Sequence, residues 1–297
     1  MTEVFRGACT ALVTPMTERG VDYAALEKLI DFQLGGGIDA LLSCGTTGEP
    51  STLSAEEKRE LISFTVKKAA GRVPVLAGTG GNDTAAVLSA CRSAEKAGAD
   101  ALLVVTPYYN KATQNGLAAH YAAILQSTDL PVIAYNVPAR TGLNMLPRTA
   151  EKLCAFKNFA GVKEASGNMD QVCELASLLA GRAPVYSGDD SLNLPVLAVG
   201  GAGAISVVSN VLPAAVHTLT RLFFEGDAAG AAALANKLYP MAKALFIEVN
   251  PIPAKAALSL MGICQNYLRM PLTPIEPQNL AALRQALEAF GPELAIA

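Results

Sequence analysis

The chain has 297 residues, of which 51% are hydrophobic and 16% charged, and its formal net charge is −3. This composition supplies a large buried core and, without basic runs, argues against nucleic acid as a partner. Six cysteines without a C-x-x-C pair, and a start without a signal-sequence pattern, are typical of a reduced protein of the cytoplasm, so we expect that location.

Short apolar runs alternate with longer helical patterns along most of the chain. The runs predict strands over residues 8–13, 38–44, 73–78, 99–105, 130–136, 159–165, 183–188 and 203–208. Amphipathic patterns over 23–34, 54–70 and 84–99 predict helices, and Ser54 with Glu57 fits the S-x-x-E capping box of the second. Eight strand–helix units, with strands that are apolar throughout, predict a (β/α)8 barrel over residues 1–225.

A doubly wound sheet with a nucleotide site is the alternative, and residues 78–84 (GTGGNDT) test it. Gly78, Gly80 and Gly81 follow a predicted strand and precede a helix, as in a dinucleotide-binding loop. The third spaced glycine of that loop is missing, however, and this loop follows the third strand rather than the first. A G-x-x-x-x-G-K-[ST] phosphate loop is also absent. We therefore favour the barrel and expect no cofactor.

The segment from Ser191 to Thr220 carries no Asp, Glu, Lys or Arg and is long enough to span a membrane. Glycines and prolines interrupt it, so a short helix, the eighth strand and the start of another helix explain it better, and we expect no membrane span. Helical patterns follow at 227–247, 252–263 and 278–290. They predict a C-terminal helical layer, over residues 226–297, that packs on the barrel.

Histidine is scarce, since only His120 and His217 occur, far apart and within helical patterns. A catalytic zinc ion usually has two or three histidine ligands, often with a carboxylate. The sequence therefore predicts no metal site.

In such a barrel the chemistry lies at the C-terminal ends of the strands. Those ends carry, in chain order, Thr46 and Thr47, Tyr108 and Tyr109, Tyr135 and Arg140, Lys163, Gly188, and Ile205. The set contains an amine, a guanidinium and several hydroxyls. Tyrosine and threonine hydroxyls both donate and accept protons, so they can shuttle the protons that imine formation requires.

Lys163 lies within the sixth predicted strand, where side-chain alternation places it on the same face as Gly161 and Ala165. These small neighbours leave space around its amine. An exposed lysine at a strand end is the ordinary interpretation. Burial in a barrel mouth, in contrast, lowers the pKa of an amine and suits it to Schiff-base formation with a carbonyl. Two other lysines are weaker candidates for the Schiff-base nucleophile, because neither lies in the C-terminal part of a predicted strand: Lys111 is in a loop and Lys255 is at a helix start.

Motifs that span nearly the whole chain carry a family resemblance. In order, they are GACTALVTPM, GTTGE, TPYYN, YNVPARTG, GVKEASG, SGDD, GAISV, NPIPAK and RMPLTPI. Together they closely resemble the dihydrodipicolinate synthase family of pyruvate-dependent class I aldolases, to which N-acetylneuraminate lyase is related. The resemblance implies that pyruvate forms an imine on Lys163, becomes an enamine and attacks L-aspartate 4-semialdehyde, in lysine and diaminopimelate biosynthesis.

The same resemblance implies roles for the other strand-end residues. Tyr135, Thr46 and Tyr109 would form a proton relay, with Tyr109 supplied by a neighbouring subunit. The expected assembly is at least a dimer, with a homotetramer built as a pair of dimers favoured. Thr47 would bind the pyruvate carboxylate, and the backbone at Gly188 and Ile205 would line the pocket around Lys163.

Arg140 lies at a position that distinguishes the synthases of this superfamily from its sugar-acid lyases. By the resemblance, an arginine in YNVPxRTG recognises the carboxylate of the semialdehyde in the synthases, whereas the sugar-acid lyases lack it. A guanidinium suits that task because it binds a carboxylate through a planar fork. The alternatives are an exposed loop arginine, a pyruvate-releasing lyase of a sugar acid or hydroxy-oxo acid, and a non-enzymatic binding protein on a decayed barrel. The presence of the lysine and its relay argues against the last.

Lysine-inhibited members of the family bind lysine at a tight dimer interface. Ser51, Asn82 and Tyr108 are compatible with such a site. Ala55 and Lys58, in contrast, stand where those members carry histidine, or an acid at the second position, and Ala86 stands where they carry a glutamate that pairs with the effector's amine. An added ammonium and a missing carboxylate both disfavour a cationic ligand. We therefore expect a vestigial or weak lysine site.

Overall fold

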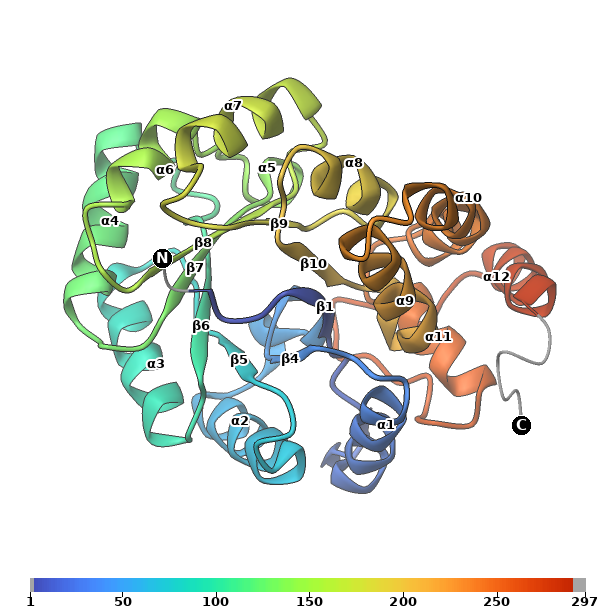
Figure 1. The fold of residues 1–297 in the computed structure, drawn as a ribbon. Coiled ribbons are helices and arrows are strands. Elements are labelled where there is room, and N and C mark those ends of the chain that lie inside the picture. The colour runs from blue at the N-terminus through green and yellow to red at the C-terminus, as the bar shows by residue number, and fades with distance from the viewer. Residues whose placement is uncertain (1–2, 291–297) are drawn as a thin grey trace.

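The computed structural model describes residues 3–290. Its barrel strands are β1 (Gly7–Ala11), β4 (Ala40–Ser43), β5 (Val75–Gly78), β6 (Ala101–Val105), β7 (Val132–Asn136), β8 (Phe159–Glu164), β9 (Val185–Ser187) and β10 (Gly203–Ser206). All pair in parallel and close in the order β1-β10-β9-β8-β7-β6-β5-β4 (Figure 1). The predicted strands and the barrel are confirmed, and the doubly wound sheet is excluded because the sheet has no free edge.

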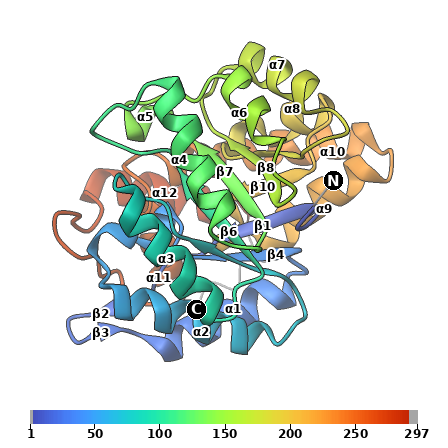
Figure 2. The same cartoon turned by 90° about the vertical axis from the view of Figure 1, so that its left-hand side faces the viewer.

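Helices surround the strands in a ring (Figure 1). They are α1 (Tyr23–Gly35), α2 (Ala55–Ala69), α3 (Thr84–Lys96), α4 (Gln114–Gln126), α6 (Pro147–Leu153), α7 (Met169–Leu179), α8 (Asn193–Ala198) and α9 (Pro213–Phe224). The capping box of α2 is present, since the Glu57 N–H donates to the Ser54 hydroxyl at 3.1 Å and the Ser54 N–H to the Glu57 carboxylate at 2.8 Å. A hairpin of β2 (Met16–Thr17) and β3 (Gly20–Val21), which was not predicted, projects from one end of the molecule (Figure 2).

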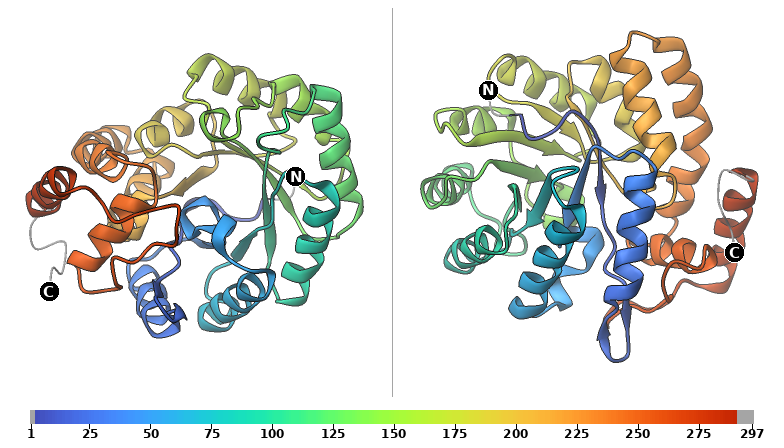
Figure 3. Two further views of the ribbon diagram at one scale, coloured as in Figure 1. Left: turned by 180° about the vertical axis from the view of Figure 1, so that it is seen from behind. Right: turned by 60° about the horizontal axis from the view of Figure 1, so that its bottom comes forward.

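The C-terminal part forms α10 (Ala228–Leu245), α11 (Ile252–Leu260) and α12 (Pro277–Phe290). These helices contact one another on one side of the barrel, and α10 also packs against α9 (Figure 3). The segment 191–220 contains α8, β10 and the start of α9, as predicted. Within residues 3–290, no helix combines the length and apolarity needed to cross a bilayer. The domain boundary at residue 225 stays a prediction, and the last part of the expected layer, 291–297, lies outside the described residues.

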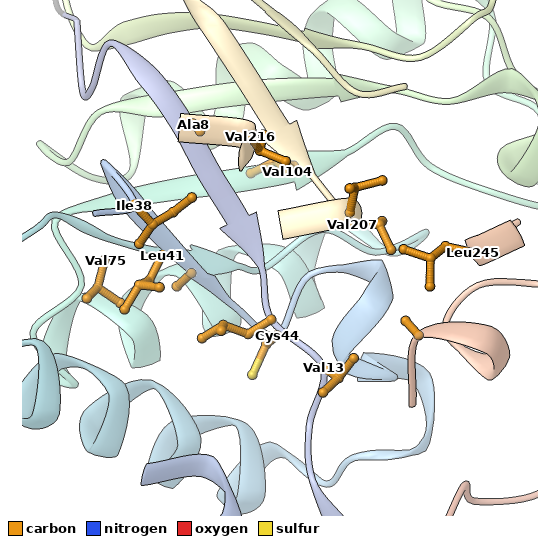
Figure 4. Packing of buried hydrophobic residues seen from close by; sticks show 14 of the residues in the cluster. Ala8, Val13, Ile38, Leu41, Cys44, Val75, Val104, Val207, Val216 and Leu245 are labelled. Atoms are coloured by element: carbon orange, nitrogen blue, oxygen red, sulfur yellow. The ribbon is translucent and has the colours of Figure 1, made fainter. Parts of the chain in front are cut away.

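The core consists of two layers separated by the barrel wall. Cys9 and Leu42 belong to the cluster inside the barrel, whereas their chain neighbours Ala8 and Leu41 belong to the cluster between the strands and the helices. Figure 4 shows members of this outer cluster, including Leu41 and Val75. Because both faces of each strand are buried, the strands read as continuous apolar runs.

Strand β8 has an irregularity just before Lys163. The pairing of β7 with β8 shifts register at Gly161, whose φ is +115° and where a Cβ would lie 2.2 Å from the Pro184 carbonyl oxygen. Ala160 therefore faces the barrel interior and Val162 the outer cluster. A bulge here adds one residue and resets the alternation along β8, so the expectation that Gly161 shares the face of Lys163 stays a prediction. Ala165 does pack against the interior cluster.

Candidate active site

A cavity of about 290 Å³ opens at the C-terminal ends of the strands. Of the predicted site residues, it is lined by Thr46, Thr47, Tyr135, Arg140, Lys163 and Gly188. The threonines come from the turn η1 (Thr46–Gly48) after β4, and Arg140 from α5 (Pro138–Thr141) after β7. The closed barrel thus brings together residues that are up to about half the chain apart in sequence.

Lys163 is buried at the bottom of this cavity, with only 5% of its surface exposed. Its Nζ lies 4.2 Å from the centroid of the Tyr135 ring. Burial lowers the pKa of Lys163 to about 8, Arg140 adds to the shift, and Cys9 and Asp190 oppose it. A minor fraction of the amine is therefore neutral near neutral pH, far more than for an ordinary lysine, and it can attack a carbonyl. The interpretation as an exposed strand-end lysine is wrong.

Gly188 makes room for this side chain. A Cβ at position 188 would lie 2.9 Å from Lys163 Cε and 2.8 Å from Ala165 Cβ. Both contacts are closer than van der Waals packing allows, so the residue that follows β9 must be glycine for Lys163 to keep its position.

Tyr135 supplies a hydroxyl group to the same cavity. Burial raises the pKa of Tyr135 to about 12, whereas Arg140 and a hydrogen bond with the Thr46 side chain lower it. The phenol therefore stays protonated at neutral pH and can both donate and accept a proton. A Tyr135–Thr46 pair beside a buried amine has the composition of a proton relay.

Asn250 was not predicted as a site residue, yet it joins two that were. Its Nδ2 donates to the Thr47 hydroxyl at 2.9 Å, and its carbonyl oxygen accepts a hydrogen bond from Arg140 at 3.1 Å. Its buried Oδ1 has no hydrogen-bond partner among the described residues and the residue lines the cavity. The NPIPAK motif was the available signal, but it lies in the C-terminal segment, away from every strand end.

Asp190 fixes the loop that follows β10. Its carboxylate accepts hydrogen bonds from the Ser206 hydroxyl at 2.5 Å and from the backbone N–H groups of Val207 and Val208 at 2.8 and 3.0 Å. Ile205, just before this loop, has its side chain in the barrel interior and does not line the cavity. The expected contribution of its backbone stays a prediction.

The structure does not bring Tyr109 into the cavity of its own chain. Tyr109 is 88% exposed and has a φ of +74°. Tyr108 instead lines a second cavity, of about 450 Å³, which shares Thr46 and Arg140 with the first.

The residues of the expected lysine site are divided. Ser51, Lys58 and Tyr108 line the second cavity. Ala55, Asn82 and Ala86 are exposed and lie outside its lining. As for metals, no group of three or more potential ligand residues occurs between residues 3 and 290.

Comparisons with known proteins show what this chain is similar to in sequence and fold. Residues 4–290 match the model of the dihydrodipicolinate synthetase family. A 4-hydroxy-tetrahydrodipicolinate synthase of Thermoanaerobacter sp. (strain X514) is 48% identical over 97% of each chain. The crystal structure of dihydrodipicolinate synthase from Thermotoga maritima is 44% identical, with a TM-score of 0.96 over 97% of this chain and 99% of that one. A monomeric dihydrodipicolinate synthase variant is also 44% identical, with a TM-score of 0.96 over 97% of each chain.

Proposed function

The chain belongs to the dihydrodipicolinate synthetase family, and from this premise we propose that its barrel cavity condenses pyruvate with L-aspartate 4-semialdehyde to 4-hydroxy-tetrahydrodipicolinate. The enzyme is a lyase of lysine biosynthesis. The observation that carries the proposal is the buried amine of Lys163 in a cavity that also presents Thr47 and Arg140, groups suited to two carboxylates.

The first step uses the neutral amine of Lys163. It attacks the keto carbon of pyruvate, and the carbinolamine then loses its hydroxyl as water to give the imine. Tyr135 and Thr46 carry the protons, because their hydroxyls hydrogen-bond to each other near Lys163. The Thr47 hydroxyl, oriented by Asn250, binds the pyruvate carboxylate.

The second half of the reaction makes the carbon–carbon bond. Loss of a proton from the pyruvate methyl group converts the imine to an enamine, whose carbon attacks the aldehyde while the aldehyde oxygen takes up a proton. The substrate's own amino group then attacks the imine carbon and displaces the Lys163 amine. This closes the ring without a second dehydration, so the water lost in imine formation is the only water released.

A substrate comparison tests the proposed function. The protein is incubated with pyruvate plus L-aspartate 4-semialdehyde, and separately with N-acetylneuraminate, and the heterocyclic product and released pyruvate are measured. We expect condensation with the semialdehyde and no pyruvate release. Pyruvate release without condensation would instead establish a sugar-acid lyase.

Arg140→Ala is expected to weaken use of the semialdehyde. Arg140 is held by the Asn250 carbonyl at the edge of the cavity, where its guanidinium can bind the substrate carboxylate. Loss of such a charged hydrogen bond should raise KM for the semialdehyde roughly 10- to 100-fold. The rate at which pyruvate is trapped by borohydride should be largely retained. Arg148→Ala, which removes an exposed arginine of α6, is the matched control. An equal loss of both activities would assign Arg140 a structural role.

We propose that Tyr109 completes the cavity of a neighbouring subunit, within a homotetramer. The support is its exposed ring on a loop beside Tyr108. Because a monomeric variant exists among the relatives, the assembly needs its own test. The inactive variants Lys163→Ala and Tyr109→Phe, mixed under subunit exchange, are expected to regain activity, since a mixed pair contains one intact site. No recovery in mixed oligomers, or a fully active monomer in light scattering, would contradict the proposal.

Feedback by lysine is expected to be weak. Lys58 lines the second cavity. Ala86 is exposed and lies outside that lining in a single chain, but at the dimer interface that the family resemblance implies it would offer no carboxylate to an ammonium ligand. A missing partner of a buried charge costs ~2–5 kcal/mol, or roughly thirtyfold or more in affinity. The measurement is the initial rate against lysine concentration at subsaturating pyruvate. Strong inhibition at sub-millimolar lysine would show that the second cavity binds lysine despite these substitutions, and Ala86→Glu serves as the variant expected to gain sensitivity.

A further inference from the structure

An ion pair that the proposed reaction does not use is buried between the barrel and the C-terminal layer. Lys255 Nζ, in the first turns of α11, lies 2.5 Å from Glu49 Oε1, and their side chains are 0% and 1% exposed. The ammonium also donates to the Tyr267 carbonyl at 2.8 Å, and the second carboxylate oxygen accepts the Arg269 N–H at 3.3 Å. Lys255 itself does not line the catalytic cavity.

Glu49 is the last residue of the GTTGE segment that carries Thr46 and Thr47. It joins η1 to the next turn, η2 (Pro50–Thr52), with a left-handed φ of +56° and ψ of 46°. Its N–H donates to the Thr46 carbonyl at 3.2 Å. A residue with a side chain adopts this backbone conformation only where its surroundings hold it there, so the position of η1 depends on what holds Glu49.

The residues just before α11 hold this segment at a second point, because Asn250 donates a hydrogen bond to the Thr47 hydroxyl. A buried ion pair adds little net stability compared with apolar side chains of the same shape, whereas one unpaired buried charge is costly. The ion pair therefore fixes the positions of the Glu49 segment and of α11 relative to each other more than it stabilises the fold.

We infer that Glu49 and Lys255 are positioning residues, whose contact sets the place of Thr46 and Thr47 relative to Lys163. The inference rests on the proposed function, since it assigns these threonines to the relay and to the pyruvate carboxylate. It gives the C-terminal layer a part in pyruvate binding, although the barrel strands supply the reacting amine.

The test compares Glu49→Gln and Lys255→Met with a matched control. Glu57→Gln breaks the neighbouring, partly exposed ion pair with Arg269, which joins the same C-terminal segment to α2 rather than to η1. The rate of borohydride trapping of pyruvate on Lys163, KM for each substrate and the melting temperature are measured. We expect both variants of the buried pair to lose about 10²-fold in trapping rate and in kcat/KM for pyruvate, as misplacement by about 1 Å can cause. KM for the semialdehyde should stay unchanged.

The double variant Glu49→Gln/Lys255→Met keeps the test informative if a single variant fails to fold, because it leaves no buried charge unpaired. Its trapping rate should be no lower than that of the slower single variant, because both substitutions break the same contact. Two results would overturn the inference but not the proposed function. One is a lower melting temperature with an unchanged trapping rate in the Glu49 and Lys255 variants. The other is an equal loss of trapping rate in Glu57→Gln. Absence of an adduct in the unaltered protein would overturn the proposed function together with the inference.

Discussion

Replacing Lys163 by methionine is expected to abolish both condensation and the borohydride-trapped pyruvate adduct. Methionine has a similar volume, so the barrel interior stays filled while the nucleophile is lost. Removal of a covalent nucleophile lowers turnover by roughly 10⁴-fold or more. The measurements are the rate of product formation and peptide mass mapping after reduction, which should place the adduct of the unaltered chain on Lys163.

Lys111→Met is the matched control, because Lys111 lies in an exposed loop, and it should keep the adduct. The pH dependence of the unaltered chain checks the same assignment. Since the pKa of Lys163 is lowered to about 8, the neutral amine predominates above that pH and declines below it. Trapping at low pyruvate should therefore rise with a midpoint near pH 8 and level off above it. An adduct on Lys255, or a rate independent of pH across this range, would contradict the mechanism.

Tyr135→Phe is expected to lower turnover by ~10²–10⁴-fold, the usual contribution of general acid–base catalysis. The ring stays in the interior cluster, so the fold should be kept, but the hydroxyl that hydrogen-bonds to Thr46 is gone. Steady-state rates at saturating substrates measure the effect, and circular dichroism verifies the fold.

Tyr186→Phe is a matched control for this change. Tyr186 belongs to the same interior cluster, but its hydroxyl donates to the Phe5 carbonyl at 2.9 Å, away from the cavity. Its loss should lower the melting temperature and leave turnover unchanged. Near-normal turnover in Tyr135→Phe, or equal losses in the two variants, would remove Tyr135 from the relay.

The barrel could be predicted because its strands are buried on both faces and are separated by well-marked helices. Local irregularities could not. The bulge at Gly161 depends on the register between β7 and β8, which side-chain alternation within one strand does not reveal. The two-residue strands β2 and β3 are too short for a periodic pattern.

The candidate site divides in the same way. Lys163, Tyr135 and the threonines lie at strand ends, where barrel topology alone places them together. Asn250 comes from 203 residues beyond Thr47, and only the packing of the C-terminal helices brings it there. The Glu49–Lys255 ion pair is equally distant in sequence, so Lys255 could be identified as a candidate but its partner could not.

The barrel closes between its first and its last strand, since Gly7 of β1 pairs with Gly203 of β10. During translation, at about 5–20 residues per second, β1 is synthesised roughly 10–40 s before β10. For that interval the nascent chain has an open sheet edge, which other chains can pair with. Asn250 and Lys255 are synthesised later still. A ribosome-stalled chain that ends before α11 would consequently have the reactive amine but lack the contacts that place its threonines, and we expect catalytic competence to appear only near the end of synthesis.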